Sequence, residues 1–318
     1  MPMPQSYSFT RFLSAKRTVD DRALNEHVWQ QLLSLLKTAF ARPPLHILEL
    51  GAGIGSMAER LICANVLNEA TYTAIDANPD AIAQGHLDMQ RWASEAGFQL
   101  TIHTTGSTTG GALRRDRQDV TLHLETVDLF DFIAQQRGQR TWDLLVAHAL
   151  LDLLDVPTAL PALLSALSPG GCFYFPITFD GATILEPAID PPYDAHIEAL
   201  YHTTMDQRVV QGRGSGDSRT GRHLFGHLRA LGADILGAGS SDWVVFAGPE
   251  GYPADEAYFL HDIINTMHAA LANHPELDAR RFAQWVNQRH AQIEDGTLVY
   301  IAHQLDLVGR VPSPSHAH

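Results

Sequence analysis

The sequence predicts an α/β fold built on a doubly wound, largely parallel sheet. Between residues 45 and 180, short apolar runs typical of buried strands alternate with segments of helical periodicity. The first of these runs ends at a cluster of glycines. Strands that alternate with helices form a parallel sheet with right-handed crossovers and helices on both faces. The 318 residues, 45% of them hydrophobic and 18% charged, support a large core and exclude a mostly disordered chain.

The first half of the chain predicts these elements in order. Residues 20–41 carry leucines at helical spacing, and the prolines that follow end that helix. Strands are expected at 45–50, 71–75, 120–127, 142–148 and 172–179. Helices are expected from Ser56, from Pro79 and over 157–167, and the sequence GSTTGG at 106–111 is interpreted as a loop.

The second half departs from this alternation. Prolines and glycines are frequent over 181–217, with a short helix expected at 193–206. Helices follow at 219–231, 254–273 and 278–294, and strands at 242–247 and 297–309. We therefore predict an N-terminal helical arm at 1–44, one sheet domain at 45–311 with cap insertions at about 181–217 and 250–295, and a flexible tail at 312–318.

Composition excludes several classes of function. The chain has 36 acidic and 22 basic residues, a net charge of −14, which disfavours a nucleic-acid or anionic-membrane partner. Only Lys16 and Lys37 are lysines, and no glycine run precedes a Lys-Ser or Lys-Thr pair, which excludes a P-loop and disfavours Schiff-base catalysis. Cys63 and Cys172 are too few for a disulfide framework. With no apolar run of membrane-spanning length and no signal-peptide pattern, we expect a cytoplasmic protein.

The most informative segment is Glu49-Leu50-Gly51-Ala52-Gly53-Ile54-Gly55, at the end of the first predicted strand. Glycines let the backbone turn tightly and approach a ligand, while the following helix offers free N–H groups. A dinucleotide site prefers the spacing G-x-G-x-x-G. The nearby Glu49 would repel a pyrophosphate and suits a ligand with an ammonium group. Asp76, at the end of the second strand, can accept hydrogen bonds from ribose hydroxyls, or it can cap the next turn.

These motifs resemble the class I S-adenosylmethionine-dependent methyltransferases. ILELGAGIG matches the first motif of that family and TAIDAN the second, and the segments VDLF, WDLLVAHALLDLL and LSPGG match the later ones. The resemblance implies a seven-stranded sheet in the order 3-2-1-4-5-7-6 with strand seven antiparallel. Residues 242–247 would then form strand six and 297–309 strand seven.

The resemblance also implies the cofactor, S-adenosyl-L-methionine, and the residues that bind it. These are Glu49, Gly51, Ala52, Gly53, Gly55, Asp76, Ala77, Asp128, Leu129 and His148. Asp76 would bind the ribose and Asp128 the adenine amine. Asp128 is also well placed to cap the helix that follows it, and one side chain can do both.

Catalytic candidates are sought where parallel strands end, beside the topological switch point. His148 follows the fourth strand and could act as a general base, although it could also only line the pocket. Asp152 could orient it or cap a turn, and Asp180 follows the fifth strand. Tyr193, His196, Tyr201 and Arg219 are predicted to line the substrate pocket. No metal is expected, because the His223–His227 pair lacks the glutamate of an H-E-x-x-H motif.

These observations predict an enzyme that transfers a methyl group to an O or N atom, less readily a C atom, of a small molecule by in-line displacement in a closed pocket. The predicted insertions would form the pocket wall. A homodimer is compatible with this interpretation. Two alternatives remain: a non-catalytic S-adenosylmethionine-binding or regulatory protein, and an NAD(P)-dependent Rossmann oxidoreductase.

Overall fold

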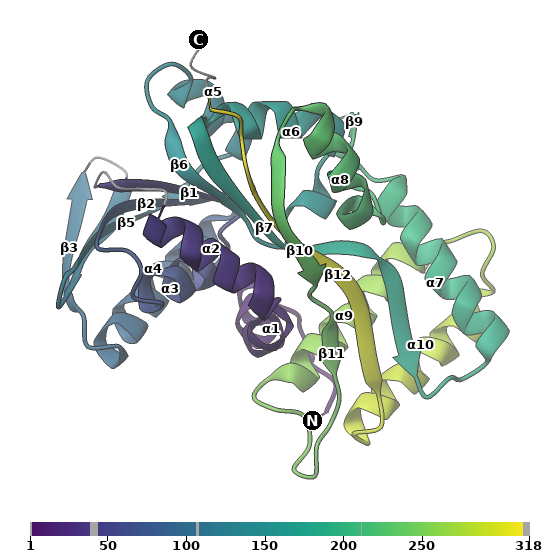
Figure 1. Cartoon of the computed structure of the whole chain (residues 1–318). Coiled ribbons are helices and arrows are strands. Elements are labelled where there is room, and N and C mark those ends of the chain that lie inside the picture. Colours follow the sequence, from purple (N-terminus) through teal and green to yellow (C-terminus); the bar gives the residue numbers. More distant parts are fainter. Residues whose placement is uncertain (1, 39–43, 106–107, 211, 314–318) are drawn as a thin grey trace.

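The centre of the molecule is one large mixed sheet (Figure 1). The computed structural model describes residues 2–38, 44–105, 108–210 and 212–313. The strands of this sheet follow one another in space as β10-β12-β7-β6-β1-β2-β5-β4-β3, and β11 pairs with β12. Their bounds are β1 (Leu45–Leu50), β2 (Glu69–Asp76), β3 (Gln99–Thr105), β4 (Thr108–Arg115), β5 (Gln118–Thr126), β6 (Trp142–Ala147), β7 (Leu167–Glu186), β10 (Asp234–Ser240), β11 (Trp243–Val245) and β12 (Val299–Arg310).

The predicted strand order lies within this sheet. The series β5-β2-β1-β6-β7-β12-β10 is the order 3-2-1-4-5-7-6, with β12 antiparallel to both of its neighbours. The pairs among β5, β2, β1, β6 and β7 are parallel. The predicted count of seven is wrong, because the described residues form ten strands in this sheet.

The expected loop at 106–111 is one source of the difference. Residues 106–107 lie outside the described residues, but β4 begins at Thr108 and pairs antiparallel with both β3 and β5. Gly110 occupies an interior strand position where a Cβ atom would lie 2.6 Å from the carbonyl oxygen of Leu122. Gly110 therefore allows close backbone approach within a strand, a role that is easily mistaken for a turn.

The prediction that residues 242–247 form strand six is also wrong. The strand in sixth position of the order is β10, which comes before these residues in the sequence. Residues 243–245 form β11, which pairs with the far end of β12. The sequence of β10, DILGAGS, contains two glycines and alternates between half-buried and exposed positions. The Trp-Val-Val of β11 has the stronger strand propensity, so propensity favoured the wrong segment.

Helices cover both faces of the sheet, and the N-terminal arm contains two of them. Their bounds are α1 (Phe9–Ala23), α2 (Glu26–Thr38), α3 (Ser56–Cys63), α4 (Pro79–Glu95), α5 (Leu129–Gln136), η1 (Leu151–Leu153), α6 (Val156–Ser165), α7 (Pro191–Asp206), α8 (Thr220–Ala230), α9 (Glu256–Leu271) and α10 (Ala279–Glu294). The prediction of a single helix over 20–41 is wrong, because the helical conformation is interrupted at Leu24 and Asn25, between α1 and α2. Residues 39–41 of the predicted helix lie outside the described residues. Asn25 starts the second helix: its Oδ1 accepts a hydrogen bond from the Val28 N–H.

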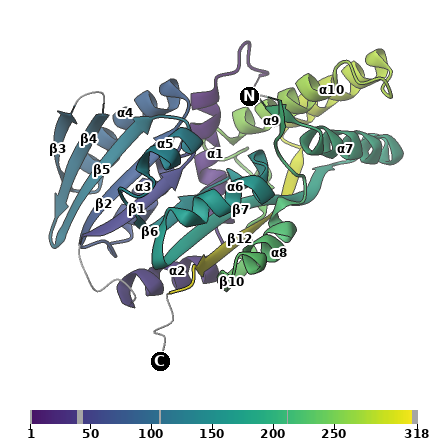
Figure 2. The same ribbon diagram turned by 90° about the horizontal axis from the view of Figure 1, so that it is seen from above.

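Three buried apolar clusters follow from this arrangement. One packs α2, α3 and α4 against one face of the sheet, and a second packs α5, α6 and α8 against the other. The third joins α1, α7, α9 and α10 at the far end of β12. Figure 2 shows α7, α9 and α10 grouped at the end of the molecule opposite β3.

The segments predicted as insertions are largely ordered secondary structure. β7 continues as far as Glu186, past the predicted end at 179, and α7 and the small hairpin of β8 (Val209–Val210) and β9 (Arg213–Gly214) follow. Within the predicted tail, residues 314–318 lie outside the described residues. In the described ranges, no helix combines the length and apolarity that crossing a bilayer requires.

Candidate functional site

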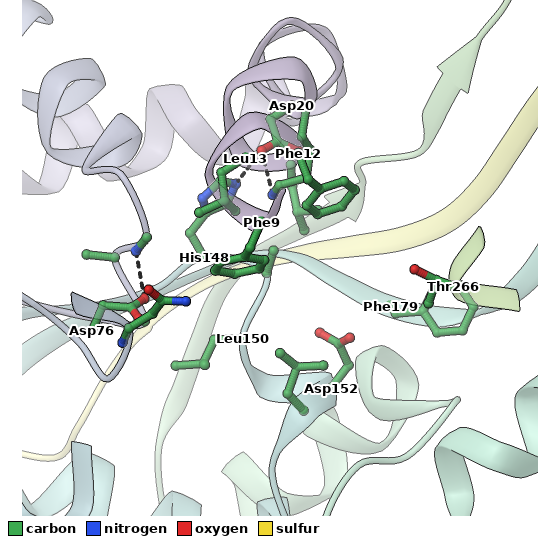
Figure 3. Close-up of a pocket in the computed structure, with 18 of the residues that line it drawn as sticks. Phe9, Phe12, Leu13, Asp20, Asp76, His148, Leu150, Asp152, Phe179 and Thr266 are labelled. Carbon is green, nitrogen blue, oxygen red and sulfur yellow. Dashed lines mark hydrogen bonds and ion pairs between the residues drawn. The ribbon is translucent and has the colours of Figure 1, made fainter. Parts of the chain in front are cut away.

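A cavity of about 1160 Å³ opens at the carboxyl ends of the parallel strands (Figure 3). Its first part, which we call the glycine-loop half, is formed by residues 51–54, 76–80 and 127–129 after β1, β2 and β5. Its second part, the α9 half, is formed by Asp152, Phe179, Tyr201, Arg208, Asp262 and Tyr300. Figure 3 shows Asp76 at one end of the cavity and Phe179 with Thr266 at the other.

The glycine loop adopts a backbone that other residues reach only with strain. Gly51, Gly53 and Gly55 have φ of +63°, +56° and +78°. A Cβ atom would lie 2.7 Å from Leu150 Cδ1 at Gly51 and 3.1 Å from Leu13 Cδ1 at Gly53. The loop therefore keeps its backbone close to the cavity and begins α3 at Gly55.

Asp76 is fixed by the loop that it faces. Its Oδ2 accepts a hydrogen bond from the Gly53 N–H and its Oδ1 one from the Asn78 N–H, each 2.8 Å long. A carboxylate has about four lone-pair sites, so both oxygens can accept a further hydrogen bond from a ligand hydroxyl.

Asp128 has the helix-capping role that the sequence allowed. Its Oδ1 accepts hydrogen bonds from the N–H groups of Phe130 and Asp131, at 2.8 and 3.2 Å, at the start of α5. The structure gives Oδ2 no hydrogen-bond partner among the described residues, and Asp128 lines the cavity. Capping therefore leaves one oxygen available to a ligand.

Helix α1 covers the glycine-loop half. It belongs to the predicted N-terminal arm, although no residue of that arm is among the predicted site residues. Phe9, Phe12 and Leu13 project from α1 toward the cavity above His148 (Figure 3). Phe12 also stacks on Phe259 of α9, with ring centroids 5.6 Å apart. The helix thus bridges the glycine loop and α9, and its apolar side chains form part of the cavity wall.

A buried polar network lies beneath α1. Lys16 Nζ is 2.8 Å from Asp20 Oδ2, and His148 Nε2 is 3.3 Å from the same oxygen. The Trp243 indole donates a hydrogen bond to Asp20 Oδ1 at 2.9 Å. Asp20 is 1% exposed, Lys16 7% and His148 8%. All four residues line the cavity. Lys16, the only lysine among the described residues of α1, therefore belongs to the same network as His148, the predicted general base.

The network sets the charges of its members. Burial acts to raise the pKa of Asp20, but Lys16 and His148 outweigh it, so the pKa lies well below its usual range. Burial lowers the pKa of His148 to about 4, although Asp20 acts in the opposite direction. At neutral pH the site therefore holds a carboxylate, paired with Lys16, beside a neutral imidazole.

Two strained residues lie between the two halves of the cavity. Ala149 and Ile177 have φ of +49° and +54°, and both line the cavity. Positive φ is rare for a β-branched residue and occurs where surrounding structure enforces it. Here the Ile177 N–H donates a 2.7 Å hydrogen bond to Oδ1 of the buried Asp306, whose Oδ2 accepts from the Asn25 N–H. The carboxylate of Asp306 thus holds both the strained part of β7 and the turn between α1 and α2.

The predicted residues divide into two groups. Those that line the cavity are Gly51, Ala52, Gly53, Asp76, Ala77, Asp128, Leu129, His148, Asp152 and Tyr201. Those that do not line it are Glu49, Gly55, Asp180, Tyr193, His196 and Arg219.

Asp180 is turned away from the cavity. Its Oδ1 accepts hydrogen bonds from the backbone N–H and the Nε of Arg222, at 2.7 and 2.9 Å. Its Oδ2 lies 3.6 Å from His303 Nε2. The structure therefore replaces the expected catalytic role with that of anchoring α8 to β7.

Glu49 lies behind the glycine loop. Its Oε2 accepts a 2.8 Å hydrogen bond from the Tyr72 hydroxyl, and burial raises the pKa of Glu49 to about 8. Glu49 is not among the residues that line the cavity, so its predicted contact with an ammonium group stays a prediction. Gly55 supports the loop from the first position before α3.

Of the other three, Tyr193 is buried in the apolar cluster of α7, α9 and α10, whereas His196 and Arg219 lie nearer the surface. Tyr193 packs under the Arg281 guanidinium, which lies 3.9 Å from the ring centroid. His196 is partly exposed, 3.8 Å from Glu276, and Arg219 is exposed at the start of α8. The proline-rich segment that contains α7 was predicted to cover the site. Only the last turns of α7, which include Tyr201, line the cavity.

No grouping of three or more His, Cys, Asp or Glu suited to a metal ion occurs within the ranges that the structure describes. The polar groups that line the cavity include its carboxylates and the neutral imidazole of His148, and aromatic side chains form part of the rest of its wall.

No protein-family model matches the chain, and no curated protein sequence matches it. Among solved structures, it is similar to the [4+2]-cyclase SpnF, with 17% identity over 98% of this chain and 99% of that one, and a TM-score of 0.42. It is also similar to a putative sarcosine dimethylglycine methyltransferase from Galdieria sulphuraria (12% identity, 94% and 88% coverage, TM-score 0.41). A third is the plantazolicin methyltransferase BpumL in complex with SAH (14%, 94% and 90%, TM-score 0.38).

The chain's own strand order and glycine loop agree with the fold expected from its sequence. A sheet in the order 3-2-1-4-5-7-6 with an antiparallel β12, and a glycine loop joined to Asp76 between β1 and β2, is the arrangement that the resemblance to class I methyltransferases implies. A fold class does not by itself specify a reaction, which has to be argued from the site.

Proposed function

We propose that the protein is an S-adenosylmethionine-dependent methyltransferase that acts on an O or N atom of a small molecule. One observation carries the proposal: the glycine loop and Asp76 form one wall of a cavity that continues well beyond them. Pockets for single ligands measure about 300–1,000 Å³. At about 1160 Å³, this cavity has room for a cofactor and an acceptor together.

The residues present fit S-adenosylmethionine. The Asp76 oxygens would accept hydrogen bonds from the ribose hydroxyls, and the available Asp128 oxygen one from the adenine amine. Gly51 and Gly53 would let the backbone lie against the amino-acid part. When bound, S-adenosylmethionine supplies a methyl group on a positively charged sulfur, a good leaving group for in-line displacement.

The chain's own residues would align the acceptor and manage its proton. Phe9, Phe12 and Leu13 line the cavity from α1 and would form an apolar cover over the bound cofactor. His148 lines the cavity with Nε2 3.3 Å from Asp20 Oδ2, and the unprotonated nitrogen of its neutral ring would accept a proton from the acceptor. Asp152, from the α9 half, extends the wall next to His148 and would help position the acceptor.

Two measurements test the proposal. Calorimetry should detect binding of S-adenosylhomocysteine to the wild-type protein, and transfer of a radiolabelled methyl group from S-adenosylmethionine into fractions of a small-molecule extract should follow. Binding of NADH without S-adenosylhomocysteine would instead favour an oxidoreductase. Cofactor binding without transfer to any fraction would favour the non-catalytic alternative.

A further inference from the structure

The charged side chains of the cavity are predominantly acidic. Six aspartates line it, Asp20, Asp76, Asp80, Asp128, Asp152 and Asp262, against one lysine and one arginine. Lys16 is paired with Asp20, and Arg208 donates a 3.0 Å hydrogen bond from Nε to the Ser215 carbonyl oxygen. The cavity wall therefore favours positively charged ligands over anions.

Asp262 stands out within the α9 half. Asp262, Thr266 and Ala270 follow one another at four-residue spacing, so one face of α9 lines the cavity. Figure 3 places Thr266, one turn after Asp262, at the end of the cavity away from Asp76. The carboxylate of Asp262 has no hydrogen-bond or ion-pair partner among the described residues.

Asp262 is half-buried, so its carboxylate has lost part of its hydration, and a ligand cation in the cavity would pair with it. Burial raises the pKa of Asp262 to about 6, because the group has lost water and gained no cation. Aromatic side chains also line the cavity, among them Phe179, Tyr201, Trp243 and Tyr300. Aromatic faces attract cations and also accept flat or aliphatic groups.

We propose that the methyl acceptor is a cationic amine with an apolar or aromatic body, whose ammonium group is anchored by Asp262 in the α9 half. The inference rests on the proposed function, because it assigns the second molecule in the same cavity. Asp262 acts here as an anchor for specificity. The atom that receives the methyl group lies nearer His148, so the anchoring ammonium need not be the methylated atom.

The test compares three probes that share one body and differ in charge. The protein is saturated with S-adenosylhomocysteine, and the binding of 4-phenylbutylamine, 4-phenylbutanol and 4-phenylbutyrate is measured by calorimetry at pH 7.5. We expect the amine to bind more tightly than the alcohol, and the carboxylate to bind weakest.

Two variants locate the effect. Asp262→Asn should weaken amine binding roughly tenfold or more and leave alcohol binding unchanged, since only the charge-assisted contact is lost. Asp116→Asn removes the same charge at an exposed turn with φ of +53°, a conformation that asparagine tolerates, and should change neither. Affinity for S-adenosylhomocysteine should stay within about twofold in both, which shows that the cavity is intact.

The inference is overturned if wild-type protein binds the amine no better than the alcohol, if no amine binding is detected, or if Asp262→Asn leaves amine affinity unchanged. Each of these results stands apart from failure of the proposed function. That function fails when S-adenosylhomocysteine itself does not bind to the wild-type protein.

Discussion

The two halves of the cavity are built in different ways. The glycine-loop half is formed by the glycine loop and by residues at the ends of β1, β2 and β5. Within it, the loop holds the carboxylate of Asp76 through the Gly53 N–H. The α9 half consists of side chains from η1, β7, α7, α9, β12 and the residues just after α7. A wall made of backbone tolerates little change in chain geometry, whereas a wall made of side chains can be altered one residue at a time. This contrast suits a constant cofactor on one side and a specific acceptor on the other.

The sharpest way to break the glycine-loop half is Gly53→Val. The residue would have to adopt φ of +56° with its side chain against Leu13, so we expect affinity for S-adenosylhomocysteine to fall by about 100-fold or more. Gly97→Val is the matched control, because Gly97 has φ of +75° and a Cβ atom there would meet nothing within 4 Å. Equal loss of binding in the two variants would show a general effect of strain.

His148→Ala tests whether His148, between the two halves of the cavity, acts as a general base. If His148 accepts the acceptor's proton, the turnover number should fall by about 10²-fold or more, with cofactor affinity nearly unchanged. Steady-state kinetics under saturating cofactor give the answer. A change confined to KM would reduce His148 to a residue that positions the acceptor.

Asp76→Ala should weaken binding of S-adenosylhomocysteine by about 1–3 kcal/mol, the cost of leaving ribose hydroxyls without an acceptor. Calorimetry against Asp180→Ala provides the comparison, since Asp180 is bonded to Arg222 and does not line the cavity. Unchanged affinity in Asp76→Ala would remove this carboxylate from the cofactor site.

The smallest expected effect concerns Glu49 and stability. Its pKa is about 8 in the folded protein and about 4.5 in the unfolded chain, so between these values the folded state binds more protons. Stability contributed by the neutral carboxyl group is therefore present below pH 4.5 and is lost as the pH rises toward 8. Thermal unfolding should show a Tm that declines over this range, and Glu49→Gln should flatten the decline. A steeper decline in Glu49→Gln would contradict the assignment.

Local sequence signals were enough for the glycine-loop half. The apolar run of β1, the glycines after it and Asp76 lie within about thirty residues, and parallel strand ends meet at one edge of a sheet. Asp180 looked equivalent to these residues because it also follows strand residues, but its side chain points to Arg222. Strand position therefore predicted which residues reach the switch point and not which way each one faces.

The α9 half and the cover of α1 could not be predicted in the same way. Phe9, Lys16 and Asp262 have no motif around them, and they meet only because distant segments pack together. Asp20 reaches Trp243 across more than two hundred residues of chain. A helix face with one aspartate resembles any solvated helix until the packing of its neighbours is known.

The connection between α1 and α9 has a consequence for how the chain becomes active during synthesis. Arg11 is bonded to Asp255, and Thr18 and Arg22 to Glu256, so α1 packs against residues that are synthesised more than two hundred positions after it. Contacts of such long sequence separation form slowly. A nascent chain can pair β1, β2 and β6 early, but α1 closes over the glycine loop only after α9 has emerged. Closure of the site should therefore be a late event, which keeps incomplete chains from presenting a finished site.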